Sequence, residues 1–358
     1  MPEPGADLLD LTAALVAIPS VSRAEAELAG RIEAALRLVP WLSVERVGDN
    51  VVARTNAGRQ ARVVLAGHLD TVPPDGNEAP RIEGDTLWGL GAADMKGGLA
   101  VMLDLARTVA EPAVDVTYVF YAGEEIAAEH NGLRELFASR PDLVRGDVAL
   151  LGEPTGATLE AGCQGTLRMD VTLRGARAHT ARPWMGRNAI HRLGKVLTAV
   201  AAYEARQPVL AGCTFREALQ AVAVTGGGAG NVVPDRVELT LNHRFAPDRS
   251  VAEAAAHVHD LLGPHLDPGD DVRLVDAAPA AAPAVDHPLV AGLVSRHGLA
   301  VSAKLGWTDV ARFAEHGMPA ANFGPGDSAL AHRADERVTR ADLERCRHVL
   351  ADLLSHDA

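Results

Sequence analysis

This sequence predicts an α/β fold in which a mostly parallel sheet is flanked by helices and a smaller α+β domain is inserted into the chain. Short apolar runs alternate with helical patterns over residues 1–165, as in parallel sheets covered by helices. Over residues 166–280 the order changes to βαββαβ, which is typical of a ferredoxin-like domain. The alternation returns over residues 281–358. We therefore expect one catalytic domain built from both chain ends and a separate lid domain between them.

The expected elements follow from the spacing of apolar residues. In the first part, helical periodicity covers much of residues 7–36, 96–109 and 126–139. The strand-like runs there are 50–54, 62–66, 114–121 and 147–151. In the inserted part, the expected strands are 166–174, 219–225, 236–245 and 272–275, and the expected helices are 188–205 and 251–262. The Ala/Pro-rich stretch 277–283 is the expected linker back to the first domain.

Composition narrows the class of protein. The 358 residues are 47% hydrophobic and 23% charged, as in globular proteins, and 34 basic against 47 acidic residues give a net charge of −13. An acidic surface repels phosphate backbones, so we expect no nucleic-acid partner. Three widely spaced cysteines, no basic segment before an apolar N-terminal core and no apolar run of about 20 residues indicate a cytoplasmic protein without a membrane partner.

Acidic and histidine residues fall after several predicted strands and in one Gly-rich stretch. The set is His68, Asp70, Asp94, Glu124, Glu125, Glu153 and His332. In open α/β sheets, ligands bind outside the carboxyl ends of the strands, so these side chains are expected to meet there. Histidine with carboxylates suits zinc, with manganese or cobalt as other choices. Two such ions can polarise a carbonyl and acidify water, and a spare carboxylate can move the proton.

Each of these residues also has a simpler structural interpretation. Glu124 and Glu125 could favour a helix N-terminus, and Asp94 could cap the helix that follows it. All the simple interpretations would have to hold at once, so a metal site is the better explanation. The stretch 89–98 does not match a dinucleotide-binding fingerprint, because Asp94 stands where a glycine is needed and would repel a pyrophosphate.

Four motifs in order resemble the dizinc deacylase/carboxypeptidase family. They are the stretches 67–73 (GHLDTVP), 88–98 (WGLGAADMKGG), 123–125 (GEE) and 152–155 (GEPT). The resemblance covers essentially the whole chain and implies a zinc-peptidase-like catalytic domain holding two zinc ions. It implies His68 and Glu153 on one ion, Glu125 and His332 on the other, and Asp94 bridging both.

The same resemblance implies further roles. Glu124 would be the general base and acid, Asp70 would orient His68, and the peptide bond between Asp94 and Met95 would be cis. In the inserted domain, His179 matches a lid histidine that stabilises the oxyanion from the partner subunit of a homodimer. Asn231 and Arg244 match substrate-binding residues of the lid.

The closing stretch 306–332 looks most like the desuccinylases of this family from high-GC Gram-positive bacteria. This likeness implies hydrolysis of N-succinyl-LL-2,6-diaminopimelate, an N-acyl amino acid of lysine and diaminopimelate biosynthesis, with N-acetylornithine deacetylase or a related aminoacylase as the alternative. Many desuccinylases have an arginine where this chain has Cys163. Either Arg244 with Arg177, Arg182 or Arg312 takes over the carboxylate, or the acyl preference differs.

Overall fold

The computed structural model describes residues 1–356, which divide into two compact units. The α/β unit contains Met1–Gly162, Pro283–Ser302 and Arg312–Ala358, and the α+β unit contains Cys163–Ala282 and Ala303–Ala311. Each unit has its own apolar core. Both ends of the chain therefore contribute to one unit, and residues 303–311, which were expected in the catalytic domain, group with the α+β unit. The use of residues 166–280 as a lid and dimerisation domain remains a prediction.

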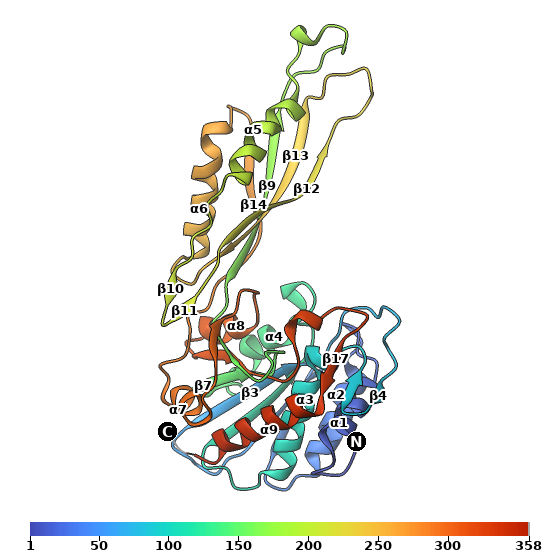
Figure 1. Ribbon diagram of the computed structural model, residues 1–358, viewed down its shortest axis with the longest axis vertical. Helices are drawn as coiled ribbons and strands as arrows, with labels where there is room; N and C mark the ends of the chain where they lie inside the picture. Colours follow the sequence, from blue (N-terminus) through green and yellow to red (C-terminus); the bar gives the residue numbers. More distant parts are fainter. Residues whose placement is uncertain (357–358) are drawn as a thin grey trace. The chain divides into compact units, whose positions relative to one another are not determined.

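An eight-stranded sheet forms the centre of the α/β unit (Figure 1). Its strands are β1 (Ser43–Val47), β2 (Asn50–Arg54), β3 (Arg62–His68), β6 (Asp115–Tyr121), β7 (Val148–Leu151), β8 (Leu159–Ala161), β15 (Val301–Ala303) and β16 (Ala320–Asn322), in the order β1-β2-β6-β3-β7-β16-β8-β15. The four central strands β6, β3, β7 and β16 are parallel, whereas β1, β2 and β8 pair antiparallel. The mostly parallel sheet is thus confirmed at its centre, where every residue of β6 is buried.

Helices flank this sheet, as predicted. They are α1 (Leu8–Val16), α2 (Ala26–Arg37), α3 (Gly97–Thr108), α4 (Gly132–Ser139), α7 (Pro288–His297), α8 (Val310–Glu315) and α9 (Arg340–Leu354). Helices α1, α3 and α9 pack against one another (Figure 1). Within the described residues, none of the helices combines the length and apolar character that crossing a bilayer requires.

The expected helix over 126–139 is wrong in its first half. A 3₁₀ turn, η2 (Ala128–His130), comes first, and α4 begins at Gly132. The side chain of Asn131 accepts a hydrogen bond from the amide of Arg134, so it caps the helix there. The two glutamates at 124 and 125 therefore precede a loop rather than a continuous helix.

A second, three-stranded sheet of the α/β unit was not predicted. It consists of β17 (Arg337–Thr339), β5 (Thr86–Trp88) and β4 (Arg81–Glu83), with β5 in the middle. The guanidinium groups of Arg81 and Arg337 lie 5.1 and 4.7 Å from the ring centroid of Trp88. Strand β5 leads into the Gly-rich stretch and β17 follows the segment that carries His332, so this small sheet ties the two segments together.

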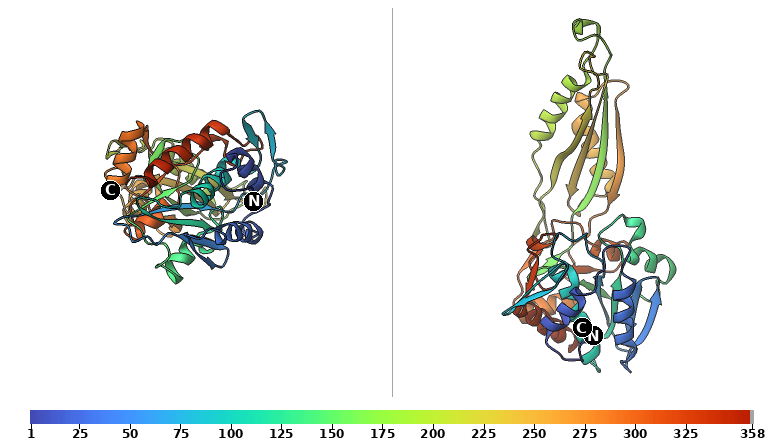
Figure 2. Two further views of the ribbon diagram at one scale, coloured as in Figure 1. Left: turned by 90° about the horizontal axis from the view of Figure 1, so that it is seen from below. Right: turned by 90° about the vertical axis from the view of Figure 1, so that its right-hand side faces the viewer.

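The α+β unit is a four-stranded antiparallel sheet with two helices on one face (Figures 1 and 2). Its strands are β9 (Gly165–Arg174), β12 (Ala218–Gly226), β13 (Arg236–Phe245) and β14 (Asp271–Ala278), its helices are α5 (Ala189–Ala201) and α6 (Val251–Leu262), and β10 (Val209–Leu210) pairs with β11 (Cys213–Thr214). The sheet order β12-β13-β9-β14 matches the predicted ferredoxin-like arrangement. Alternate residues of β9 and β13 face the core under the helices.

Four short turns complete the chain. They are η1 (Ala92–Lys96), η3 (Pro183–Met185), η4 (Gly263–His265) and η5 (Ser328–Leu330). In η1 the peptide bond between Asp94 and Met95 is cis, as the family resemblance implied.

Candidate active site

The carboxyl ends of neighbouring strands position the predicted site residues. Strand β3 ends at His68, β6 leads to Glu124 and Glu125, and β7 leads to Glu153. Asp94 lies in η1, directly before α3. Because parallel strands end at the same edge of a sheet, side chains far apart in the sequence are brought to one place.

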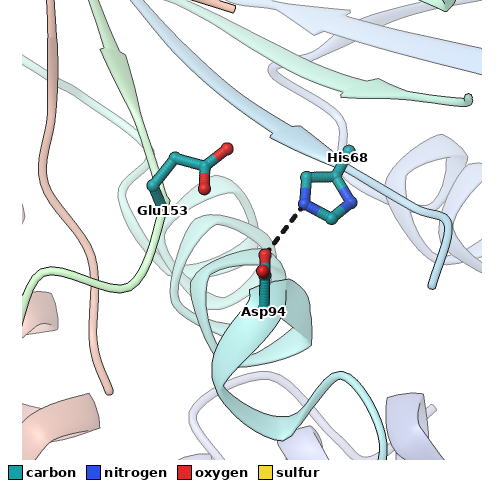
Figure 3. A group of neighbouring side chains, drawn as sticks. All are labelled: His68, Asp94 and Glu153. Atoms are coloured by element: carbon teal, nitrogen blue, oxygen red, sulfur yellow. Dashed lines mark hydrogen bonds and ion pairs between the residues drawn. The ribbon is translucent and has the colours of Figure 1, made fainter. Parts of the chain in front are cut away.

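One group of donor atoms comprises His68, Asp94 and Glu153 (Figure 3). One donor atom from each residue lies within 4.8 Å of the others, and Nε2 of His68 is 3.1 Å from Oδ1 of Asp94. In Figure 3 the carboxylates of Asp94 and Glu153 and the imidazole ring point toward a common space. This group is well inside the unit, since His68 and Glu153 are buried.

A second group comprises Asp94, Glu125 and His332. Nε2 of His332 is 2.7 Å from Oε1 of Glu125 and 3.5 Å from Oδ2 of Asp94. The two oxygens of Asp94 therefore face different imidazoles, Oδ1 toward His68 and Oδ2 toward His332. His332 has a φ of 62°, which is uncommon for a residue with a side chain and typical of functional sites.

A third combination overlaps these two groups. Donor atoms of His68, Glu124 and Glu125 also lie within 4.8 Å of one another. Glu124 is therefore at the edge of the same cluster. Its separate role as a proton carrier, and the division of the other residues between two ions, stay predictions.

Asp70 holds this cluster in a way that the sequence only partly indicated. Its backbone carbonyl lies 3.0 Å from Nδ1 of His68, whereas its carboxylate oxygen is 3.6 Å from the same nitrogen. The carboxylate accepts hydrogen bonds of 3.0 Å from the amides of Glu124 and Glu125 and one of 2.7 Å from the hydroxyl of Ser22. Asp70 therefore fixes both the ring and the backbone that carries two glutamates.

Glu25 was missed by the sequence reasoning. Its side chain is buried and accepts a hydrogen bond of 3.1 Å from the amide of Gly123, the residue before the two glutamates. Glu25 precedes α2, more than 90 residues away in the chain, and nothing in its local sequence marks this contact. Only the folded backbone reveals it.

Three glycines bring the elements of the site close together. A Cβ atom at Gly98 would lie 2.3 Å from the carbonyl oxygen of Gly152, and one at Gly324 would lie 2.2 Å from the same oxygen. The N-terminus of α3 and the segments after β7 and β16 therefore meet with no room for a side chain. Asp94 and Glu153 lie on the two segments that meet at Gly98 and Gly152.

The charges at the site favour a cation. Burial alone lowers the pKa of His68, but the carboxylates of Asp70 and Asp94 outweigh it and raise that pKa well above its ordinary value. The carboxylates of Asp94 and Glu125, which accept hydrogen bonds from His332, raise the pKa of His332 to about 10. Burial opposes ionisation of Asp94, yet the two imidazoles hold the pKa of Asp94 well below its usual range. Burial likewise disfavours ionised Asp70, but its hydrogen-bond donors lower the pKa of Asp70 to about 2.

The donor set fits metal ions. Imidazole nitrogens and carboxylate oxygens are typical zinc ligands, and three residues per ion with an open position are typical of catalytic sites. The buried carboxylates stabilise positive charge where the donor atoms converge, and a metal ion would supply that charge. Within residues 1–356, the three overlapping groups described above are the places where His, Cys, Asp and Glu side chains gather in this way.

The predicted lid residues belong to the α+β unit. His179 forms an isolated β-bridge with Val232, and the amide of Thr180 donates to the carbonyl of Asn231 at 3.0 Å. His179 and Asn231 therefore lie on two loop segments that run side by side. Both are exposed. Arg244 lies on β13 and is partly buried. Their contact with a substrate stays a prediction.

Two other residues were named in the prediction of how the acyl group of the substrate is recognised. Arg312 lies on α8 in the α/β unit and is partly exposed. Cys163 is fully buried, and its thiol lies 3.7 Å from the carbonyl oxygen of Thr308. Burial raises the pKa of Cys163 to about 11, so its side chain is a neutral thiol and cannot replace the charge of an arginine.

Comparison with known proteins decides the family. The profile of peptidase family M20/M25/M40 matches residues 64–356. The chain belongs to this family. As a member of the M20 family it is a metal-dependent hydrolase, which confirms the resemblance inferred from its four motifs.

Two curated M20 relatives are similar over nearly the whole chain. One, from Mycobacterium tuberculosis, is named "Putative succinyl-diaminopimelate desuccinylase DapE"; it is 54% identical over 335 residues, which are 93% of each chain. Another, the succinyl-diaminopimelate desuccinylase of Corynebacterium glutamicum, is 44% identical and covers 99% of this chain and 98% of its own.

Solved structures share the M20 fold at low sequence identity. A tripeptidase from Staphylococcus aureus superimposes with a TM-score of 0.79 at 20% identity, over 97% of both chains. The YXEP protein of Bacillus subtilis, a dinuclear metal binding peptidase from the M20 family, gives a TM-score of 0.73 at 16% identity over 97% of this chain and 96% of its own. These likenesses confirm the predicted fold class.

Proposed function

We propose that this chain is a dizinc amide hydrolase that converts N-succinyl-LL-2,6-diaminopimelate and water to succinate and LL-2,6-diaminopimelate. The observation that carries the metal chemistry is Asp94, whose two carboxylate oxygens face His68 and His332. The names of the relatives at 54% and 44% identity support the substrate and its place in lysine and diaminopimelate biosynthesis.

Five residues would hold the two ions. His68 and Glu153 would bind one, Glu125 and His332 the other, and Asp94 both, in keeping with the two donor groups that share Asp94. Zinc suits this set, and cobalt or manganese are substitutes. When bound, such ions polarise the scissile carbonyl and lower the pKa of water.

Glu124 would carry the proton in the reaction. Its backbone is fixed by Asp70, and its carboxylate belongs to the same cluster of donor atoms as His68 and Glu125. It would accept a proton from the attacking water and return it to the amine nitrogen as the amide C–N bond breaks. One water is consumed, and one carboxylate and one amine are released.

Residues of the α+β unit would bind the substrate. The imidazole of His179 would donate a hydrogen bond to the developing oxyanion, and Asn231, on the adjacent loop segment, would orient the substrate. The guanidinium of Arg244, with that of Arg312, would pair with carboxylates of the substrate, because a guanidinium binds a carboxylate through two parallel hydrogen bonds.

A side-by-side assay tests this function. Metal-reconstituted protein is given N-succinyl-LL-2,6-diaminopimelate, N-acetylornithine and a dipeptide, and the released amine is measured together with the metal content. We expect fast release from the succinyl substrate with about two ions per chain. No succinate release at millimolar substrate by fully loaded protein would contradict the proposal.

N-acetylornithine deacetylase is the second candidate. The specific observation that favours it is Cys163, a buried neutral thiol where many desuccinylases have an arginine for the succinyl carboxylate. Faster release from N-acetylornithine than from the succinyl substrate in the same assay would select this alternative. The zinc chemistry would be unchanged.

We also propose that the chain is a homodimer formed through its α+β unit. Strand β12 lies at the edge of its sheet, and residues 220–226 are all exposed, including Val222 and Val224. A long exposed apolar edge strand is a template for pairing with another strand. A second copy of the chain would cover it.

Light scattering on the purified protein tests the dimer. We expect a mass twice that of the chain for the wild type and a shift toward monomer for Val222→Lys, because a lysine disfavours edge pairing. Val209→Lys, at an exposed residue of β10, is the control and should leave the mass unchanged. A monomeric wild type would rule the dimer out.

We further propose that the enzyme works in the cytoplasm. Cys163, Cys213 and Cys346 are all free and buried, which suits a reducing compartment.

A further inference from the structure

Glu336 is a buried acidic residue that lies outside the three groups of candidate metal ligands. Its residue is 1% exposed, and it lies four positions after His332 and directly before β17. One carboxylate oxygen accepts hydrogen bonds of 2.9 Å from the amides of Ala93 and Asp94, and the other accepts one of 2.9 Å from the amide of Gly91. The carboxylate is therefore saturated by the backbone of the loop that carries Asp94.

The main chain of Glu336 is tied to the same loop. Its carbonyl oxygen accepts a hydrogen bond of 3.1 Å from the amide of Gly89, and its own amide donates to the carbonyl of Arg333 at 3.1 Å. Next to it, Arg337 pairs with Trp88 between β17 and β5, and its guanidinium lies over the indole ring. Side chain and backbone together fasten the segment that carries His332 to the segment that carries Asp94.

Three converging N–H groups form a site for an anion. Successive backbone amides that point into one concave space stabilise negative charge, and here a carboxylate of the chain itself fills that space. Burial raises the pKa of Glu336 to about 7, and the three amide donors oppose that rise. Lys96, also buried, donates its ammonium to the carbonyl of Ile18 at 2.8 Å rather than to Glu336. The amides are thus the direct partners of this carboxylate.

We propose that Glu336 is a positioning residue that holds Asp94 between His68 and His332 and so sets the spacing of the two metal ions. The inference rests on the proposed dinuclear hydrolase. Asp94 is the residue shared by both donor groups, so a small shift of its backbone changes both at once. Glu336 acts by accepting hydrogen bonds from the amides around Asp94 and belongs to none of the three donor groups.

The test is Glu336→Gln. A glutamine keeps the size of the side chain, but its NH₂ group donates where the carboxylate accepts, so at least one of the three amides loses its acceptor. We expect metal affinity, titrated calorimetrically into metal-free protein, to fall about 10- to 100-fold, as is typical when a residue that supports metal ligands is changed. Glu315→Gln, the same change at an exposed residue of α8, is the control and should bind metal like the wild type.

Two further measurements separate positioning from general stability. With excess metal, Glu336→Gln should show a lower kcat and an unchanged KM, and Glu336→Asp, which keeps the charge on a shorter arm, should bind metal with intermediate affinity. The unfolding temperature of the metal-free variants should stay near that of the wild type. Wild-type metal affinity in Glu336→Gln would overturn the proposal, and so would unfolding of both variants, because Glu336 would then hold the whole unit.

The same experiment keeps this inference separate from the proposed function. A wild type that binds two ions but hydrolyses none of the three substrates contradicts the function and leaves the role of Glu336 intact. A wild type that hydrolyses the succinyl substrate, beside a Glu336→Gln variant with wild-type metal binding, contradicts only the role of Glu336.

Discussion

The α/β unit and the α+β unit hold their candidate site residues in different ways. In the α/β unit, buried carboxylates accept hydrogen bonds from the backbone beside the site: Asp70 from the amides of Glu124 and Glu125, and Glu25 from that of Gly123. In the α+β unit, His179 and Asn231 are exposed, and backbone hydrogen bonds join their segments. The first unit fixes its groups in advance, whereas the second presents them at a surface.

The buried charges of the α+β unit serve its own stability. Glu217 is buried and pairs with Arg206 and Arg249, each at 3.2 Å, and Asp270 pairs with Arg192 in the first turn of α5. None of these residues belongs to the metal cluster. A buried acidic residue therefore does not by itself indicate a functional site. In the α/β unit such residues accept hydrogen bonds from the backbone beside the candidate metal ligands, whereas in the α+β unit they pair with arginines.

The largest effect should come from Glu124 in the fixed unit. Glu124→Ala removes the proposed proton carrier, so we expect kcat to fall about 10²- to 10⁴-fold while the metal content stays unchanged. Succinate release and elemental analysis measure the two quantities. Glu129→Ala, an exposed residue of the following turn, is the matched control. Retained activity in Glu124→Ala would refute its role.

The next largest effect should come from His179 in the α+β unit. His179→Ala should lower kcat about 10²- to 10³-fold with unchanged metal content, because the proposed oxyanion donor is lost. His191→Ala, exposed on α5, should have little effect. If His179 serves the site of the partner subunit, mixing Glu124→Ala with His179→Ala should restore about a quarter of the sites after random exchange in a twofold dimer. No recovery after demonstrated exchange would argue against a shared site.

A change at Asp70 in the α/β unit should have an effect of intermediate size on metal affinity and activity. Asp70→Asn keeps the backbone carbonyl near His68 but removes one acceptor for the amides of Glu124 and Glu125. We expect metal affinity and activity to fall about 10- to 100-fold, with metal rescuing part of the activity. Asp75→Asn, exposed in the next loop, should match the wild type in a metal titration. Equal affinities for Asp70→Asn and wild type would show that the amides need no acceptor.

The smallest effect concerns stability of the α+β unit. Burial would raise the pKa of Asp270, but hydrogen bonds from Arg192 and two backbone amides lower that pKa from 3.8 to about 2. Because the folded pKa is the lower one, the stabilisation is complete above about pH 4 and is lost as the pH falls toward 2. Asp270→Asn should therefore lower the free energy of unfolding by about 1.5–3 kcal/mol near pH 7, and less at pH 3.

Urea unfolding from pH 7 to pH 3 measures this dependence. Asp260→Asn, an exposed residue of α6, is the control. A difference between Asp270→Asn and wild type that stays constant down to pH 3 would contradict the role of the charge. Activity per folded molecule should not change in either variant.

The sequence predicted elements whose signals are local. Strand β2 and helix α6 have the predicted bounds: β2 is an apolar run beside a turn, and α6 starts at a capping box formed by Ser250 and Glu253. His68 and Glu153 were expected to meet because both follow strand ends, and Asp94 was expected beside them from its place in the Gly-rich stretch before a helix. In each case neighbouring residues carry the information.

Features that depend on distant backbone could not be predicted. The strands β4, β5 and β17 have three residues each and little apolar pattern, so only their mutual pairing defines them. Glu25 and Glu336 gain their partners through amides far away in the chain, and any glutamate could have done so. The start of α4 depended on Asn131, whose capping role competed with an apolar periodicity that extended too far.

The meeting of Gly98, Gly152 and Gly324 has a consequence for protein engineering. Since a methyl group at Gly98 or Gly324 would overlap the carbonyl oxygen of Gly152, a larger residue at either position would push apart the segments that carry Asp94 and Glu153. Attempts to change the substrate of such an enzyme should therefore leave these three positions unchanged and vary the residues proposed to bind the substrate, such as Asn231 and Arg244. The contact between the three glycines is then kept, and only residues proposed to bind the substrate are varied.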